Sequence, residues 1–534
     1  MPPIASISPA DAGSADPRRP ASRFRPAASG RPHAQRGVVP ALRRIAPALL
    51  LALAGCAAVG PDYAPPRTAL PATWAQAAGG ASAGSGSTGA APGSAVAGPG
   101  GAVTGHDAGA PAGPPATHRS GLRAWWGLFD DPLLDALVDE ALEGSPDLRI
   151  AAARLEQARA QRGIAQAGFL PSASVSASAR ESAARGSDSS TSYGLGLDAQ
   201  WEVDLFGGLR RGLEAADADL QASAAALGSA QASLAAESAL AYLDVRLLQA
   251  RLDVAGRNLA SQEETLQLTE WRAQAGLVGS LDVEQARAGV EQVRALVPAL
   301  RSSLGQARHR HAVLAGQPLA ALDERLAVPA RIPAAPVAVP LSIPAEVLAQ
   351  RPDVHAAERT LAAETARVGQ AEAARYPGLS LAGSIGLESL TLGGLTAGGA
   401  TVRSIAANLA ATVFDGGRLR RQVEIRSAVQ AQALASYEAT VLAALEEVEN
   451  ALLAVRSARE RRSALTAAAE AARNAALLAR QRYASGLIDF QAVLDSARTV
   501  LSAEEALVAG EAETATSMVR LYKALGGGWT APQQ

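Results

Sequence analysis

The sequence predicts a mainly helical protein with some membrane β-structure, built from two tandem copies of one unit. Three observations lead to this fold class. Short motifs recur about 206–210 residues later along the chain, two long segments keep a helical apolar period, and short runs alternate apolar and polar residues. Each copy should contain a helix, two strands, a long helix and a second helix, in that order.

The internal repeat sets the domain organisation. Pro-Asp-Leu at 146–148 returns as Pro-Asp-Val at 352–354, and Gly-Leu at 276–277 returns at 486–487. Two copies of about 200 residues therefore make up nearly all of the folded chain. The predicted segments are a signal peptide with lipobox at 1–55, a lipidated N-terminal segment at 56–75, a flexible linker at 76–117, a first repeat at 118–316, a Pro-rich link at 317–344, a second repeat at 345–529 and a tail at 530–534.

The N-terminus has the pattern of a secretory signal. Basic residues ending at Arg43-Arg44 lead into an apolar run at 45–54, which is too short to span a bilayer as a helix of about 20 residues. Cys56 is the only cysteine and follows this run directly, so residues 53–56 resemble the lipobox of bacterial lipoproteins. That resemblance implies acylation of Cys56, and Ala57 in the next position implies the outer membrane. An ordinary buried free cysteine is the alternative.

The segment at 76–117 differs from the rest of the chain. It is almost all Gly, Ala, Ser, Pro and Thr, and it shows no periodicity. Such a sequence cannot bury enough apolar surface to offset its ordering entropy, so we expect a flexible linker. Beyond residue 55 no run of 18 apolar residues occurs, and the sequence predicts no transmembrane helix there.

Each copy should open with a helix and continue with two strands. The helices are expected at about 147–167 and 353–374, and Pro171 and Pro377 end them. Alternation with period two follows each proline. The apolar faces of the four strands are predicted to carry Ala173, Val175, Ala177 and Ala179; Tyr193, Leu195, Leu197, Ala199, Trp201 and Val203; Leu379, Leu381, Ile385 and Leu387; and Ile405, Ala407, Leu409, Ala411 and Val413.

Strands of about 9–12 residues with one apolar and one polar face are typical of membrane β-barrels. A soluble sandwich with one wet face is the alternative. Membrane barrels have at least eight strands, and an open edge in lipid leaves backbone groups unsatisfied. Four strands therefore predict a barrel shared between chains. The aromatic residues expected to form an interfacial girdle where strands meet helices are Phe169, Trp201, Phe206, Tyr376 and Phe414.

A very long helix should follow the second strand of each copy, at about 208–275 and 418–483. The first of these segments contains no proline and keeps leucine at seven-residue steps, with a four-residue stutter between Leu248 and Leu252. Some 65 residues at 1.5 Å each would make a rod of about 100 Å. A second helix should return after each Gly-Leu turn, at about 281–315 and 490–525.

The composition argues against several classes of function. With 49 basic and 51 acidic residues and a net charge of −2, the chain has no electrostatic footprint for nucleic acid. Lys523 is the only lysine, which excludes a lysine-containing phosphate loop. His309 and His311 are two apart on a helix and do not face one ligand, and Glu446-Glu447 is most simply a solvated face. We expect no metal, no cofactor and no catalysis.

With these elements placed, the sequence resembles the outer-membrane factor (TolC-like) family of tripartite efflux systems, especially its OprM/NodT-like lipoproteins. The resemblance rests on Gly-Cys at 55–56, Gly-Pro-Asp-Tyr at 60–63, Trp-Trp at 125–126, Asp-Pro at 131–132, Asp-Leu-Arg at 147–149, Trp-Glu-Val-Asp-Leu-Phe-Gly at 201–207, Arg-Pro-Asp-Val at 351–354 and the stretch 521–529. It implies a homotrimer that forms a 12-stranded outer-membrane β-barrel on a long α-helical periplasmic tunnel. The 76–117 linker departs from the family pattern.

The lumen and the two ends of such a channel would hold its functional residues. Asp198, Glu202 and Asp204 should fall on the polar strand face, where threefold symmetry would turn them into acidic pore-lining rings that favour cations. Local pairing with Arg210 or Arg211 is the alternative.

At the far end, Asp495 matches an Asp that rings the closed periplasmic gate in the family. One turn earlier, Gln491 stands where OprM-like members tend to have an apolar residue. An exposed helical Asp without a gating role is the alternative. The Gly-Leu turns resemble the family's adaptor-docking tips, although simple helix–helix turns would look the same. The predicted tip residues are Gly276, Leu277, Ser280, Asp282, Gly486, Leu487 and Asp489.

The resemblance implies a passive outer-membrane channel subunit, lipid-anchored through Cys56 and extending into the periplasm. It would export drugs or other small molecules delivered by a proton-driven inner-membrane pump through a periplasmic adaptor protein. One alternative is the exit duct of a type I protein secretion system. The other is a periplasmic coiled-coil scaffold without a pore, against which the alternating strands argue.

Overall fold

The structure, a computed structural model, describes residues 58–66, 124–183, 189–336, 348, 350–398 and 400–529. The chain divides into two units, Met1–Cys56 and Ala57–Gln534, and all of these residues belong to the second. The predicted signal peptide at 1–55, Cys56, the linker at 76–117 and the tail at 530–534 lie outside the described residues.

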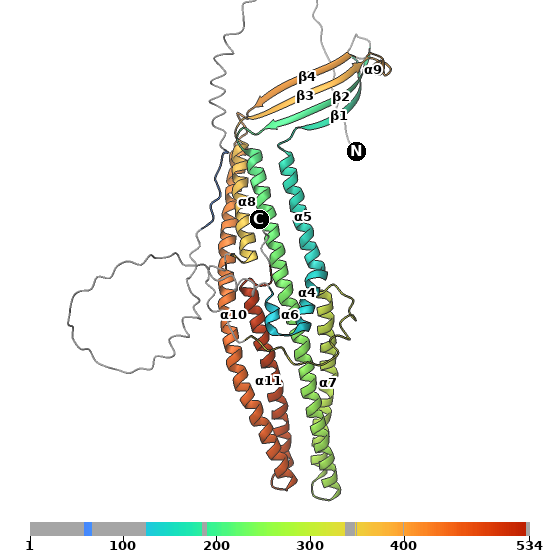
Figure 1. Cartoon of the computed structure of the whole chain (residues 1–534), viewed down its shortest axis with the longest axis vertical. Helices are drawn as coiled ribbons and strands as arrows, with labels where there is room; N and C mark the ends of the chain where they lie inside the picture. The colour runs from blue at the N-terminus through green and yellow to red at the C-terminus, as the bar shows by residue number, and fades with distance from the viewer. Residues whose placement is uncertain are drawn as a thin grey trace, which may run out of the picture. The chain divides into compact units, whose positions relative to one another are not determined.

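The repeat predicted from the sequence is present as two copies of the same element order (Figure 1). The first copy contains α5 (Pro146–Ala167), β1 (Ser172–Ser182), β2 (Ser190–Val203), α6 (Gly208–Gln274) and α7 (Ser280–Leu314). The second contains α8 (Pro352–Ala373), β3 (Gly378–Ser389), β4 (Ala400–Ala410), α10 (Arg418–Ala484) and α11 (Phe490–Ala524). The short helix α9 (Gly394–Ala397) lies between β3 and β4.

Two further elements precede the first copy. A 3-10 helix, η2 (Trp125–Phe129), leads into α4 (Pro132–Gly144), and the sequence analysis predicted neither of them. Asp131 caps α4 by accepting hydrogen bonds from the backbone N–H groups of Leu133 and Leu134. Pro132 and Pro146 each occupy the start of a helix, a position where the missing N–H is no loss.

The four strands form one antiparallel sheet in the order β1-β2-β3-β4. Val175 lies opposite Leu197, which lies opposite Ile385, and Ile385 lies opposite Arg403. Because side chains alternate between the faces of a sheet, the odd-numbered positions of all four strands share one face. This face is largely apolar, as predicted, and Val175, Leu197, Ile385 and Ile405 on it are exposed.

The predicted extent of the fourth strand is wrong at its C-terminal end. Ala411 and Val413 continue the alternating pattern, but β4 ends at Ala410 and Val413 is 97% exposed. Ala410 pairs with Gly378, the first residue of β3. Pro377 stands just before Gly378 and has no N–H to offer, so the alternation continues beyond the last available partner.

The long helices were predicted to within one or two residues. Both α6 and α10 have 67 residues, which corresponds to about 100 Å at 1.5 Å per residue. Each begins after a glycine in the left-handed region, Gly207 at φ 80° and Gly417 at φ 88°. A residue with a side chain is strained in that conformation, so the two glycines set the direction in which each helix leaves the sheet.

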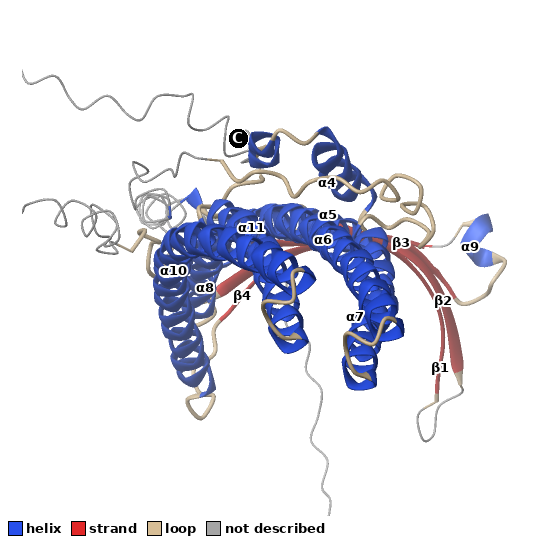
Figure 2. Cartoon of the chain, turned by 90° about the horizontal axis from the view of Figure 1, so that it is seen from below, coloured by secondary structure: helices blue, strands red, loops and turns tan. Residues whose placement is uncertain are grey.

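The helices pack as two hairpins, α6 with α7 and α10 with α11. Helix α6 also packs against α5, α8 and α11, and α10 packs against α8. Figure 2 shows the resulting row of α10, α11, α6 and α7. Most of the buried apolar residues of α6 are alanines, which allow close approach of the helices. None of the described helices combines the length and apolar composition that crossing a membrane would need.

Large buried side chains concentrate near the N-terminal helices. Trp125 stacks on Tyr522 of α11, with ring centroids 5.7 Å apart. Tyr242 of α6 is fully buried and donates a hydrogen bond of 2.5 Å to Asp131. The same cluster includes Met518 and Leu521, so it joins η2 and α4 to both hairpins.

Candidate functional site

Two of the predicted pore residues lie on the polar face of the sheet. Asp198 and Glu202 occupy even-numbered positions of β2 and are exposed. Asp198 accepts a hydrogen bond of 2.9 Å from the Ser176 hydroxyl and lies opposite Ser384. Glu202 lies opposite Ser380. This face therefore offers a polar surface with two acidic side chains per chain on β2.

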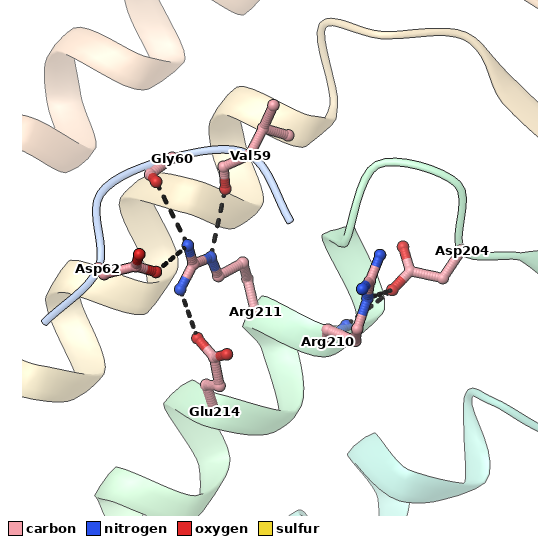
Figure 3. A network of polar contacts seen from close by, with 7 residues as sticks. All are labelled: Val59, Gly60, Asp62, Asp204, Arg210, Arg211 and Glu214. Atoms are coloured by element: carbon pink, nitrogen blue, oxygen red, sulfur yellow. Dashed lines mark hydrogen bonds and ion pairs between the residues drawn. The ribbon is translucent and has the colours of Figure 1, made fainter. Parts of the chain in front are cut away.

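The placement of Asp204 on that strand face is wrong. Strand β2 ends at Val203, and Asp204 lies in the turn that leads into α6. Its carboxylate accepts hydrogen bonds from the backbone N–H of Arg210 (3.0 Å) and from Arg210 Nε (3.4 Å). The alternative of local pairing with Arg210 is confirmed for this residue (Figure 3). Asp204 satisfies a free N–H at the positive end of a long helix.

The neighbouring Arg211 makes a separate site that sequence reasoning missed (Figure 3). Its buried guanidinium donates to the carbonyl oxygens of Val59 (3.2 Å) and Gly60 (3.2 Å), and to the carboxylates of Asp62 (2.6 Å) and Glu214 (2.8 Å). We call this set of contacts the Arg211 clamp. Burial alone would lower the pKa of Arg211, but the hydrogen bonds to Asp62 and Glu214 outweigh burial and raise the pKa.

The clamp holds the segment 58–66 against α6 and α8. The residue Gly60 has φ 98°, and a side chain there would collide with the backbone of Gly369 on α8. The hydroxyl of Tyr63 donates to Glu358 at 2.9 Å, and its ring lies under the Arg359 guanidinium. The Gly-Pro-Asp-Tyr motif at 60–63 was the available sequence signal, but only the fold brings it to Arg211.

At the opposite end of the helices, both predicted tips are tight turns. Gly276 and Gly486 adopt left-handed backbone conformations, with φ 71° and 75°. The apolar side chains that follow them are exposed, Leu277 at 67% and Leu487 at 73%. Each Leu N–H closes its turn by donating to a carbonyl of the preceding helix, Arg272 O and Arg482 O respectively.

The polar tip residues sit at the starts of the return helices. Ser280 is the first residue of α7, and Asp282 lies in its first turn. Asp489 caps α11 by accepting a hydrogen bond of 3.1 Å from the backbone N–H of Ala492. A carboxylate in this position stabilises the start of the helix by satisfying a free backbone N–H.

The predicted gate residues lie together on α11. The Gln491 side-chain amide donates to Asp495 Oδ1 at 3.0 Å, and Arg498 lies 3.7 Å from the same carboxylate. Arg498 was not part of the sequence prediction, although its i+3 spacing from Asp495 was visible there. The carboxylate is exposed, so this pair is weak and screened by water and salt.

A contact between the two hairpins lies beside the gate residues and was also missed. Arg272, near the end of α6, donates to the backbone oxygen of Tyr483 on α10 at 2.6 Å. The Arg272 guanidinium also stands over the Tyr483 ring, 4.4 Å from its centroid. Tyr483 is buried with Phe490, Val493, Leu494 and Ala286. The repeat places Arg482 at the position equivalent to Arg272, but copy one has Ala273 where copy two has Tyr483.

Buried titratable groups elsewhere have structural partners. Burial lowers the pKa of His311 to about 4, and its Nε2 lies 3.1 Å from the Ser238 hydroxyl. Within the described part of the chain, no three His, Cys, Asp or Glu side chains are grouped so that they could hold a metal ion.

Within the described residues, the sheet has an exposed apolar face and no further strand beside β1 or β4, and it is joined to two long helical hairpins. This arrangement is typical of one subunit of a membrane channel whose barrel is shared between chains. The chain belongs to the outer membrane efflux protein family, whose sequence model matches residues 137–317 and 343–527. The protein is thus a subunit of an outer-membrane efflux channel.

Individual relatives agree with this assignment. The chain is 31% identical over 493 residues to nodulation protein T of Rhizobium leguminosarum bv. viciae, covering 92% of this chain and 94% of that protein. It is 31% identical over 496 residues to the toluene efflux pump outer membrane protein TtgF of Pseudomonas putida, covering 90% and 96%. Among solved structures, the outer-membrane channel OprN is similar with a TM-score of 0.74 at 36% identity, covering 88% of this chain and 99% of that one.

Proposed function

We propose that the protein works as a homotrimer and forms the exit duct of a tripartite efflux pump for small molecules. An inner-membrane, proton-driven pump would deliver these molecules through a periplasmic adaptor. The observation that carries the proposal is the four-stranded sheet. Within the described residues no further strand pairs with β1 or β4, and apolar side chains such as Val175, Ile385 and Ile405 are exposed on one face. Three such sheets would supply 12 strands and remove every open edge.

The sidedness of the sheet supports passive conduction. With the apolar face toward lipid, Asp198 and Glu202 would face the lumen and form acidic rings. Asp204 is left out of this proposal because it is held by Arg210. The export of toluene by the pump of the relative TtgF supports a small-molecule substrate.

Planar-bilayer recordings of the purified protein test the channel. We expect discrete conductance steps that favour cations, and Asp198→Asn with Glu202→Gln should reduce that preference without closing the pore. A chain that forms no pore would instead match a periplasmic scaffold.

Cells that lack the gene should accumulate a small fluorescent efflux substrate. An unchanged level of substrate, together with loss of a secreted protein, would indicate a secretion duct.

The tips are the proposed docking surface for the adaptor. Leu277 and Leu487 expose apolar side chains on tight turns, and Gly276, Ser280, Asp282, Gly486 and Asp489 surround them. Replacing both exposed leucines by serine should weaken capture of the adaptor by the purified channel while conductance is kept. The two tight turns themselves should remain, because Gly276 and Gly486 are unchanged and the closing hydrogen bonds come from the backbone.

The lipid anchor is proposed at Cys56, on the sequence pattern alone. Cys56→Ala should abolish incorporation of labelled palmitate into the protein. Trimer formation should survive, because the sheet carries its own apolar face. Label that persists in the variant would refute the assignment.

A further inference from the structure

Two charged residues interrupt the otherwise uncharged apolar face of the sheet. Across the odd-numbered positions of β1, β2, β3 and β4, only Glu181 and Arg403 carry charge. Glu181 is on β1 and Arg403 is on β4, which are the two outer strands. Their signs are opposite. Glu181 is one residue from the end of β1 and Arg403 is three residues from the start of β4, so each lies in the half of its own strand that is farther along the chain from the adjoining helix. A charge on the lipid side of a barrel is costly near the midplane and cheap near the interface.

The two side chains cannot meet within one chain. Arg403 lies in a row with Ile385, Leu197 and Val175, so three strand spacings of about 4.8 Å separate it from β1. Glu181 is six residues farther along β1 than Val175, which adds about 20 Å at 3.3 Å per residue. Glu181 can therefore meet Arg403 only in another copy of the chain.

A second copy of the chain brings them together. The outer edge of β4 would pair with β1 of the next copy, and the up-and-down order of the strands makes this pair antiparallel. Both strands have 11 residues. Full overlap places Ala400 opposite Ser182, which puts Glu181 opposite Thr401 and Arg403 opposite Ala179. A slide of two residues puts Glu181 directly opposite Arg403. A slide of one residue would turn the apolar face of one strand toward the lumen.

Barrel geometry selects these two registers. Within one chain, Val175 is the β1 residue in the row of Arg403. In the next copy, the β1 residue opposite Arg403 would be Ala179 or Glu181, which lies four or six residues farther along β1 than Val175. For 12 strands, these shifts correspond to tilts of about 35° and about 46°, against a usual range of about 35–45°. A shift of two residues would give a tilt of about 19°, and a shift of eight about 54°. In one allowed register Glu181 and Arg403 face each other directly, and in the other they are diagonal neighbours within reach of an arginine.

We propose that Glu181 of one copy and Arg403 of the next form an ion pair on the lipid-facing side of each seam between subunits, and that this pair selects the register in which the barrel closes. The inference rests on the proposed homotrimer. Each copy supplies one acid and one base, so three identical pairs would close the ring. A slipped register would leave two isolated charges among apolar side chains, which disfavours it.

Charge reversal tests the pair. Glu181→Arg and Arg403→Glu, each alone, should lower the temperature at which the detergent-resistant trimer dissociates, and the double exchange should restore it. Arg180→Glu is the matched control, since it reverses a charge one residue away on the polar face. The pair is wrong if the exchange is no more stable than the two single variants. It is also wrong if only Arg403→Glu has an effect, as binding of a lipid phosphate by Arg403 alone would give.

Disulfide trapping tests the register without relying on stability. Cys56 is the only native cysteine, so new cysteines report unambiguously in the full-length lipoprotein. Glu181→Cys combined with Arg403→Cys or with Thr401→Cys should give covalent dimers and trimers on oxidation, whereas Glu181→Cys with Ala407→Cys should not. A trimer that is intact by mass but cross-links at neither position refutes the seam and leaves the channel proposal standing. A parent protein that is monomeric in detergent and in membranes refutes the proposed function itself.

Discussion

A few buried polar side chains decide how distant parts of this chain are joined, and Arg211 is the most connected of them. Its guanidinium donates hydrogen bonds to two backbone carbonyls and two carboxylates. Its side chain is 5% exposed, whereas that of Asp62 is 90% exposed. Most of the stabilisation from the Arg211 clamp should therefore come from the hydrogen bonds of the buried guanidinium to the two carbonyls. The ion pair with Asp62 should contribute little.

Arg211→Ala should destabilise the folded chain by about 2 kcal/mol, because hydrogen bonds that involve a buried charge are lost. Residues 58–66 should also become accessible to protease. Asp62→Ala, the matched control, should cost about 0.5 kcal/mol because the carboxylate is solvated. Thermal unfolding followed by circular dichroism measures both effects. Equal losses in the two variants would show that the exposed pair, and not the buried donors, holds the segment.

His311 makes stability depend on pH. Burial lowers the pKa of this imidazole to about 4, from 6.5 when exposed. The folded state therefore binds fewer protons than the unfolded state between these values, and stability falls as the pH drops from about 6.5 to about 4. The full loss is at most about 3 kcal/mol, and below pH 4 this contribution is constant. Glu140, whose pKa is lowered from 4.5 chiefly by its hydrogen bond to Arg325, loses its stabilising contribution only as the pH falls below about 4.5.

His311→Gln removes the titrating group and keeps a neutral side chain that can bond the Ser238 hydroxyl. Its denaturation midpoint in urea should change less between pH 6.5 and pH 4 than that of the parent. The same pH slope in both proteins would mean that other groups cause the loss.

At the scale of elements, the regular segments could be predicted and the contacts between them could not. Period-two and heptad patterns are local, so β2 and α6 followed from the sequence to within about two residues. The end of β4 depends on Pro377, which removes the partner of Ala411, and this requires the register. Asp204 continued the alternation of β2 in the sequence, but the strand ends one residue earlier and α6 needs a cap. Arg272 and Tyr483 are 211 residues apart, and no local pattern links them.

The contact of Arg272 with Tyr483 joins the two helical hairpins of one chain at their tips. Arg272→Ala removes a hydrogen bond of 2.6 Å and a cation–π contact, and should let the hairpins separate. In planar bilayers the variant should therefore open more often or to a higher conductance than the parent. Arg482→Ala is the matched control, because it removes the same charge at the equivalent repeat position, where the side chain is exposed. A similar increase in both variants would attribute the effect to tip charge and not to the contact.

At the scale of the whole molecule, the proposed gate exists only if three copies meet. One chain shows an exposed Asp495 that accepts from Gln491 and lies near Arg498. Three such carboxylates around one axis would form an acidic ring whose charge the three Arg498 side chains offset only in part, since exposed pairs are weak. A ring of this kind attracts cations, so polyvalent cations added on the periplasmic side should block the current.

Asp495→Ala should weaken that block and leave the stability of the trimer nearly unchanged, because the carboxylate faces water and makes no buried contact. Arg498→Ala should act in the opposite direction and strengthen the block, because it removes the neighbouring positive charge. Asp282→Ala is the control for a general loss of acidic charge at the tips, and should leave the block as in the parent. The measurement is the concentration of a trivalent cation that halves the current when added from each side. If the block is as strong in Asp495→Ala as in the parent, Asp495 does not form the acidic ring that binds the cation. A weakened block in Asp282→Ala would then place it at the tips, where the adaptor is proposed to dock.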